Sequence, residues 1–215
     1  MKKLLLSLSI LILISTYSFS QTFEGREAEA KIKGAKKVEF SNRSTHPEYV
    51  EFSESSTYRK GGLNPEEVIY TLFNFSNQDQ LVAVKKTNDD LGFTHTRYKQ
   101  YYKNIPVEGA DYIAHERSGG LDCINGLLFK LNNISVIPSL SENEALKKAL
   151  TYVGAKKYMW ENIAHITELR EAFNDPNFNF NPSGKLVIYP KNNEFIESAD
   201  FRLAYKFNIY AVEPE

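Results

Sequence analysis

The feature that most constrains the fold is the stretch GFTHTRYKQYYKNIPVEGADYIAHE, which runs from Gly92 to Glu116. In its first half, β-branched and aromatic residues alternate with polar ones, a pattern that favours a strand with two usable faces. One face would carry Thr94, Thr96, Tyr98, Gln100 and Tyr102, and the other Phe93, His95, Arg97, Lys99 and Tyr101. The residues KNIP then interrupt the pattern, and ADYIAHE is typical of a second strand. We therefore predict an antiparallel pair of strands.

Further strands are expected on both sides of this pair. QLVAVKKT precedes it, and the turn signal RSGG leads to a strand in LDCI. Asn125-Gly126 is a strong hairpin signal, so we expect LLFKL to be the next strand. The region is thus predicted to be an antiparallel meander.

Three helices are expected, and two of them have readable ends. In NPEEVIYTLFNF, Asn64 is a good N-cap and Pro65 suits the first helical position. Ser141 and Glu144 form a capping box, and Gly154 closes that second helix. NIAHITELREAF predicts a third, and GKLVIYPKNNEF and FRLAYKFNIYAVEPE add strands. The fold class is therefore predicted to be α+β, with antiparallel sheets and packed helices.

The N-terminus has the three-part layout of a secretory signal peptide over residues 1–20. Two lysines precede a short apolar run, and small residues place the cut between Ser20 and Gln21. The alternative is an uncleaved anchor, although the apolar run is shorter than a membrane-spanning helix requires. We expect a secreted or periplasmic protein with no membrane segment after cleavage. Residues 21–54 lack a sustained period and are expected to be a loosely ordered leader, with one edge strand near 49–52.

Composition limits the classes of function. The 215 residues allow one medium domain or two small ones, and the net charge of −1 gives no sign of a nucleic-acid partner. Cys123 is the only cysteine, so no internal disulfide can form.

No catalytic, metal or cofactor site is predicted. His115-Glu116 begins like the zinc motif His-Glu-x-x-His, but the fifth position is Gly119 and the segment is strand-like. There is no Gly-rich phosphate loop and no Gly-x-Ser-x-Gly elbow. Carboxylates are plentiful, but no pair of them stands out.

The stretch from 91 to 115 resembles the signature hairpin of the FTP domain, the fungalysin/thermolysin propeptide module. Asn104 stands where the family favours Gly, a mild departure because Asn tolerates a left-handed turn. The motif residues carried over, with structural or inhibitory roles, are Thr94, His95, Arg97, Tyr98, Gln100, Pro106, Val107 and Gly109. Their plainer role is to hold the hairpin together.

The C-terminal part resembles the PepSY-like half of the same propeptides, and the resemblance covers about residues 55–215. It implies two propeptide subdomains of similar size: an FTP domain over 55–137 and a PepSY-like domain over 138–215. The second is expected to be incomplete at its C-terminus.

The resemblance implies an intramolecular chaperone and inhibitor of a thermolysin-like (M4) zinc metallopeptidase, whose catalytic domain is the expected partner. A tethered segment can do both without high intrinsic affinity, because its effective concentration is high. His-Glu-x-x-His does not occur in the sequence, so the chain is expected to be a truncated or split precursor, or a free-standing protein acting in trans. Two other functions stay open: an envelope module that binds extended peptides, and an enzyme in its own right.

Overall fold

The computed structural model describes residues 20–213, so all of the predicted signal peptide except Ser20 lies outside the described residues. The fold is α+β, as predicted, with mostly antiparallel strands. The strands are β1 (Gln21–Glu24), β2 (Ala35–Phe40), β3 (Tyr49–Phe52), β4 (Asp79–Asn88), β5 (Phe93–Tyr102), β6 (Ile105–Arg117), β7 (Gly120–Gly126), β8 (Lys157–Tyr158), β9 (Lys185–Pro190), β10 (Phe201–Lys206) and β11 (Ala211–Glu213). The helices are α1 (Arg26–Lys31), α2 (Pro65–Phe73), α3 (Glu142–Val153), α4 (Ile163–Phe173) and the single 3₁₀ turn η1 (Met159–Glu161).

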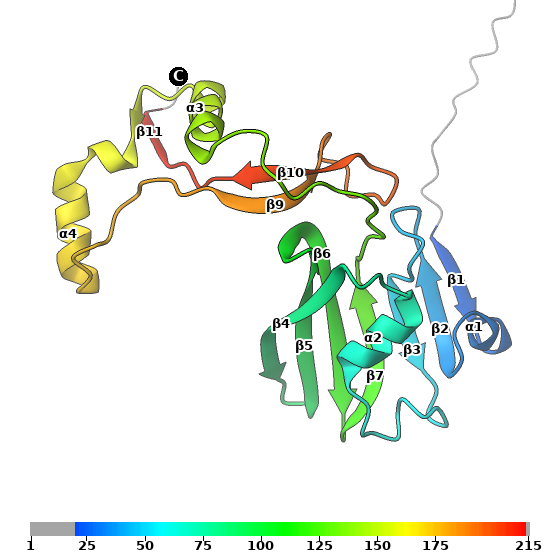
Figure 1. The fold of residues 1–215 in the computed structure, drawn as a ribbon. Helices are drawn as coiled ribbons and strands as arrows, with labels where there is room; N and C mark the ends of the chain where they lie inside the picture. Colours follow the sequence, from blue (N-terminus) through cyan, green and yellow to red (C-terminus); the bar gives the residue numbers. More distant parts are fainter. Residues whose placement is uncertain (1–19, 214–215) are drawn as a thin grey trace, which may run out of the picture.

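A single large sheet forms most of the N-terminal half (Figure 1). Its strands follow the order β1-β2-β3-β7-β6-β5-β4, and β9 and β10 join it through β6. The predicted pair is β5 and β6, joined by a two-residue turn. Lys103 and Asn104 both have positive φ, 48° and 66°, which is the backbone of a tight hairpin turn whose twist matches the strands. Asn at the second position fits that left-handed conformation.

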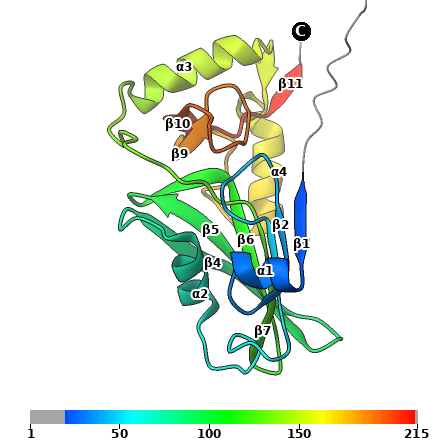
Figure 2. The same cartoon turned by 90° about the vertical axis from the view of Figure 1, so that its right-hand side faces the viewer.

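Helix α2 lies across one face of this sheet (Figures 1 and 2). Asn64 caps it by accepting a hydrogen bond from the backbone N–H of Glu66 at 3.0 Å, as its sequence predicts. Phe73 packs edge-on against Tyr112 of β6, with ring centroids 5.2 Å apart. The two predicted faces of β5 differ in burial, because Thr96, Tyr98, Gln100 and Tyr102 on one face are all buried.

The expectation that residues 21–54 are a loosely ordered leader is wrong. They form β1, α1, β2 and β3, and β3 pairs with both β2 and β7 inside the sheet. A register shift between Ala35 and Lys37 places the buried side chains of Ala35 and Val38 three residues apart. That shift interrupts the period of two, which is why the sequence shows no sustained alternation there.

The predicted strand in LLFKL is also wrong. β7 ends at Gly126, and the chain runs on beside β6, with the N–H of Leu127 donating to the carbonyl of Asp111 at 2.9 Å. Gly126 has φ +144°, and a Cβ there would lie 2.2 Å from the same carbonyl oxygen. The Asn-Gly pair therefore marks a close backbone approach rather than a hairpin turn.

Most of the C-terminal half forms as its local patterns predict, but the strand expected in FRLAYKFNIYAVEPE is interrupted: β10 ends at Lys206, and β11 begins only at Ala211. Helix α3 has both hydrogen bonds of the capping box, and Gly154 closes it with φ +65°. β9 and β10 pair antiparallel over six residues each, and β8 pairs with β11. Helix α3 buries no residue completely, so its apolar stripe is only partly covered. The boundary of a second domain at residue 138 stays a prediction.

Candidate functional site

The motif residues lie on β5 and on the first part of β6. Next to the turn, Tyr101 of β5 pairs with Pro106 of β6. Two positions earlier in β5, Lys99 pairs with Asp111, which lies five positions after Pro106 in β6. Strand β6 thus contains three more residues than β5 between these two pairs. The surplus residues form a bulge over residues 107–110, where β6 does not pair with β5 and extends toward the C-terminal half.

The bulge connects the two halves of the molecule. Val107 is buried and pairs in parallel with Ile188 of β9. Gly109 has φ +76°, and a Cβ there would lie 2.4 Å from the ring of Phe195 in the loop between β9 and β10. Only glycine accepts both the left-handed backbone and this close ring. At the bulge, Glu108 also forms an ion pair of 2.9 Å with Lys206 of β10.

Gln100 is the buried polar centre of the motif, with no exposed surface. Its amide nitrogen donates to the carbonyl of Phe129 at 2.7 Å and to Oδ1 of Asp79 at 3.0 Å. Its amide oxygen accepts from the N–H of Phe129 at 3.0 Å. The side chain thus pairs with the backbone of the buried segment after β7 as a neighbouring strand would, which explains why that segment needs no strand partner.

The loop between β9 and β10 makes a further set of polar contacts with the N-terminal half. Glu197 accepts hydrogen bonds from Ser44 at 3.1 Å and from the Thr45 hydroxyl at 2.8 Å. Phe201 packs against Phe129, with ring centroids 4.9 Å apart. We call these contacts, together with those of Gln100 and of the bulge, the junction.

The remaining motif residues lie outside the junction. Thr94 donates to the side chain of Asn88 at 2.9 Å, and Tyr98 packs into the core. Arg97 is largely exposed, and its nearest acid, Asp111, is 4.0 Å away. Arg117, at the end of β6, lies 4.8 Å over the ring of Phe93.

His95 lies directly opposite His115 in the β5–β6 ladder, a pairing that the sequence did not reveal. Their Nδ1 atoms are 2.6 Å apart. Nε2 of His95 lies 3.0 Å from Oδ2 of Asp89, and Nε2 of His115 lies 2.6 Å from Oδ1 of Asn125. Counting from the turn alone would place Tyr112 opposite His95, because the bulge of three extra residues carries no clear signal in the sequence.

Burial lowers the pKa of His115 below its ordinary value, and the nearby His95 lowers it further, while the hydrogen bond to Asn125 raises it. The pKa of Asp89 is lowered, first by the backbone N–H of Phe93 and then by His95. Burial raises the pKa of the neighbouring Cys123, so its thiol is a poor nucleophile.

The described part of the chain contains no group of three or more His, Cys, Asp or Glu side chains that could hold a metal ion. No helix within residues 20–213 is long and apolar enough to cross a membrane. Gln21, the residue after the predicted cut, is the first residue of β1 and pairs with Phe40. The cut itself stays a prediction.

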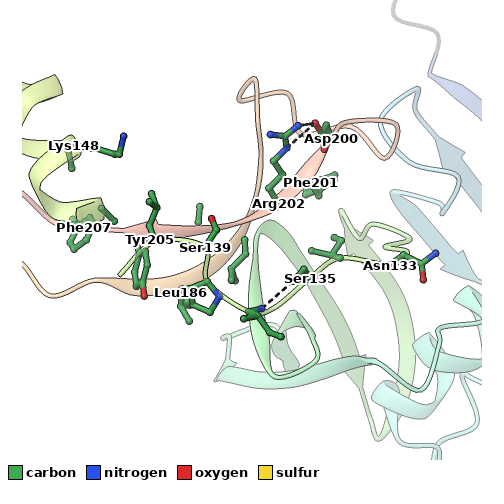
Figure 3. Close-up of a pocket in the computed structure, with 18 of the residues that line it drawn as sticks. Asn133, Ser135, Ser139, Lys148, Leu186, Asp200, Phe201, Arg202, Tyr205 and Phe207 are labelled. Carbon is green, nitrogen blue, oxygen red and sulfur yellow. Dashed lines mark hydrogen bonds and ion pairs between the residues drawn. The ribbon is translucent and has the colours of Figure 1, made fainter. Parts of the chain in front are cut away.

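A groove of about 670 Å³ lies outside the motif, between the segment 132–140, α3 and β10 (Figure 3). Lys148, Tyr205 and Phe207 line one end, and Asn133 and Phe201 lie at the other. Strand β10 pairs only with β9 among the described strands, so its other edge is open beside this groove.

Comparisons with known proteins identify the motif. Residues 79–126, which are β4 to β7, match the family model of the Fungalysin/Thermolysin Propeptide Motif. Thermolysin of Alicyclobacillus acidocaldarius subsp. acidocaldarius is 29% identical over 171 residues, which cover 74% of this chain and 28% of that protein; thermolysin of Bacillus caldolyticus matches to the same extent. Bacillolysin of Bacillus amyloliquefaciens is 28% identical over 145 residues, 67% of this chain and 25% of its own length.

The chain therefore spans 28% of the length of the thermolysins it matches. The matched motif contains the β5–β6 hairpin and its bulge, and the wider similarity extends to most of the chain. Residues 79–126 thus match the Fungalysin/Thermolysin Propeptide Motif, and the chain is similar to part of the thermolysins over 171 residues.

Proposed function

We propose that the chain is an exported, propeptide-type protein that assists folding of a thermolysin-like zinc metallopeptidase catalytic domain and inhibits it. The proposal rests on the propeptide motif at residues 79–126. Its partner is the M4 catalytic domain, bound in cis within a longer precursor or in trans as a separate chain.

The use of the motif residues supports a binding role rather than chemistry. Val107 and Gly109 hold two halves of one molecule together through the junction. Gln100 anchors Phe129, which packs against Phe201 of β10. A rigid junction fixes the surface that a partner meets, and a preorganised surface loses less conformational entropy on binding. The chain itself is proposed not to be an enzyme.

The test uses a thermolysin-like catalytic domain unfolded in denaturant. Dilution with the purified chain is expected to raise the recovered peptidase activity over dilution without it, measured after the chain has been digested or removed. Added to the folded enzyme, the chain is expected to inhibit peptide hydrolysis in a saturable manner. If it neither raises the recovery nor inhibits, the proposal fails.

Two glycine variants show whether the junction matters for this activity. Gly109→Ala, which places a Cβ against Phe195, is expected to reduce inhibition and folding assistance. Gly62→Ala has a similar φ, +82°, but no atom within 4 Å of its new Cβ, so it is the matched control. Equal effects of both variants would show that the junction plays no part.

Inhibition in cis and inhibition in trans depend differently on the concentration of the chain. A tethered partner has an effective concentration near millimolar for a short linker, whereas a free chain must bind by affinity alone. Inhibition that appears only when the chain is fused to the catalytic domain would favour action in cis. Inhibition by the separate chain at micromolar concentration would favour action in trans.

The second candidate function is an envelope module that holds an extended peptide, and the open edge of β10 beside the groove favours it. An added strand gains backbone hydrogen bonds along such an edge. Micromolar binding of unrelated extended peptides, measured by calorimetry, together with no inhibition of a thermolysin-like enzyme, would favour this function. Casein hydrolysis by the purified chain with zinc, abolished by a chelator, would contradict both proposals and indicate an enzyme.

A further inference from the structure

Four side chains form a continuous row on the outer face of the sheet, in the order Asp89, His95, His115 and Asn125. Three close contacts join them, at 3.0 Å, 2.6 Å and 2.6 Å. Each comes from a different segment: Asp89 from the turn after β4, His95 and His115 from facing positions of β5 and β6, and Asn125 from the end of β7. The row therefore crosses the hairpin and ties it to β7.

The two acceptors at the ends fix the number of hydrogens in the row. The carboxylate of Asp89 only accepts, so Nε2 of His95 donates to it. Oδ1 of Asn125 also only accepts, so Nε2 of His115 donates to it. The contact between the two Nδ1 atoms needs one more hydrogen. Three N–H hydrogens are thus required, and two neutral imidazoles carry only two.

The distance between the two Nδ1 atoms supports a shared hydrogen. Two nitrogens bound to one tetrahedral zinc at 2.0–2.1 Å would be roughly 3.3 Å apart. The observed 2.6 Å is shorter than that and corresponds to a strong, charge-assisted hydrogen bond. A second added proton would set one N–H against another across this gap and open the contact.

Other charged groups lie around the row. Cys123 on β7 is opposite His115, and Glu51 on β3 is opposite Cys123. Arg97 lies two positions from His95 and has Asp111 at 4.0 Å, while Arg117 lies over Phe93 and near Asp122. Among the described charged side chains named here, only Asp89 directly contacts the imidazole ring of His95 or His115.

We propose that His95 and His115 share a single added proton, whose charge is balanced by the carboxylate of Asp89. The β5–β6 hairpin is then most stable within the pH window in which the pair holds one added proton, neither none nor two. Above the window the proton is lost, and one of the three contacts loses its hydrogen. Below it the second proton breaks the contact between the rings. The inference concerns the propeptide sheet itself and stands whether or not the proposed function does.

The first test needs no variant. Nuclear magnetic resonance of the chain with ¹⁵N-labelled histidine, from pH 4.5 to 9, reports which ring nitrogens carry hydrogen. We expect two coupled steps for the pair, separated by a plateau at which three of its four nitrogens are protonated. Partly exposed His165 on α4, which lies outside the row, is the internal reference. Two neutral rings throughout the range above pH 6, or two independent single steps, would overturn the proposal.

The second test is a double-variant cycle of His95→Gln and His115→Gln, with His165→Gln as the control. The unfolding equilibrium constant is measured by urea denaturation at several pH values. The coupling between the two positions is expected to reach about tenfold within the window and to fall toward onefold on both sides of it. A coupling that does not change with pH would indicate a structural contact without a shared proton. If a variant fails to fold, the resonance experiment still decides.

Discussion

Gln100 shows how a single side chain can replace an element of secondary structure. All of its hydrogen-bonding groups are used, and it satisfies both backbone groups of Phe129. His46 is a contrasting buried residue, because its Nε2 is buried without a hydrogen-bond partner within the described part of the chain. It packs against Phe73 at 4.8 Å between ring centroids. Gln100 stabilises the fold through its hydrogen bonds. His46 makes stability depend on pH, because burial disfavours the charged form of its ring.

Gln100→Leu is expected to lower the free energy of unfolding by about 3 kcal/mol. The substitution keeps the volume but leaves the N–H and the carbonyl of Phe129 unpaired in the core, and each unpaired buried group costs about 1–3 kcal/mol. Urea denaturation measures the loss. Gln80→Leu, at an exposed position of β4, is the control and should change the free energy by less than about 0.5 kcal/mol. Similar losses for both would contradict the assigned role.

Stability is expected to fall as the pH drops below about 6.5, in part because of His46. Burial is the main cause that lowers the pKa of His46 from its ordinary 6.5, although Glu197 raises it. Above pH 6.5 the ring is neutral in both states; below it, the unfolded chain takes up the proton more readily than the folded one. Proton uptake by His46 therefore favours unfolding in acid.

The check is the slope of the free energy of unfolding between pH 7.5 and pH 5.5. His46→Leu is expected to have a smaller slope than the original chain, because it removes one group that resists protonation. His165→Gln, at a partly exposed position of α4, is the control for loss of a histidine outside the core. A slope that His46→Leu does not alter would refute the assignment.

At the scale of elements, the β6 bulge decides how the halves are joined. It takes residues 107–110 out of the β5 ladder and brings Val107 against β9. The same bulge sets the register that brings His95 opposite His115. One local insertion thus produces both the junction and the histidine pair.

Gly109→Ala is expected to lower the free energy of unfolding by about 3 kcal/mol, of which about 1–2 kcal/mol comes from the left-handed backbone and the rest from the clash with Phe195. Gly62→Ala shares only the backbone cost and should lose about 1 kcal/mol. Thermal or urea denaturation of the two variants gives the difference. Adding Phe195→Ala to Gly109→Ala should recover part of the loss. Equal losses in the two glycine variants would show that the ring contact is unimportant.

At the scale of the whole molecule, residues 21–54 belong to the core of the sheet. Ala28, Val38, Val50 and Phe52 have no exposed surface, and β3 covers the edge of β7. Together with the contacts of Glu197 to Ser44 and Thr45, this segment touches both halves. It is therefore a structural part of the molecule rather than a linker.

A chain beginning at residue 55 is expected to lose cooperative unfolding and to bind a hydrophobic dye, because the edge of β7 and the apolar core become exposed. A chain beginning at Gln21 is the control and should unfold cooperatively. Circular dichroism melting curves and dye fluorescence distinguish the two. Identical cooperative melting of both chains would show that the core does not need β1 to β3.

The sequence by itself determined the elements whose signals are local. The caps of α2 and α3, the two faces of β5 and the break in the strand pattern at KNIP were all predicted from residues within a few positions of one another. The propeptide motif was recognisable for the same reason, as an ordered run of residue types.

Only the tertiary structure decided the features that depend on register and on distant backbone. A register shift in β2 and the three-residue bulge in β6 are not signalled by composition, yet they decide which residues pair across strands. They place β1 to β3 within the sheet, and they bring His95 to His115. The strand expected after Asn125-Gly126 is absent because Gln100, a side chain 29 residues away from Phe129, satisfies that backbone instead. Which residues pair across a sheet depends on every register shift and bulge between them, and a local sequence pattern does not reveal these shifts.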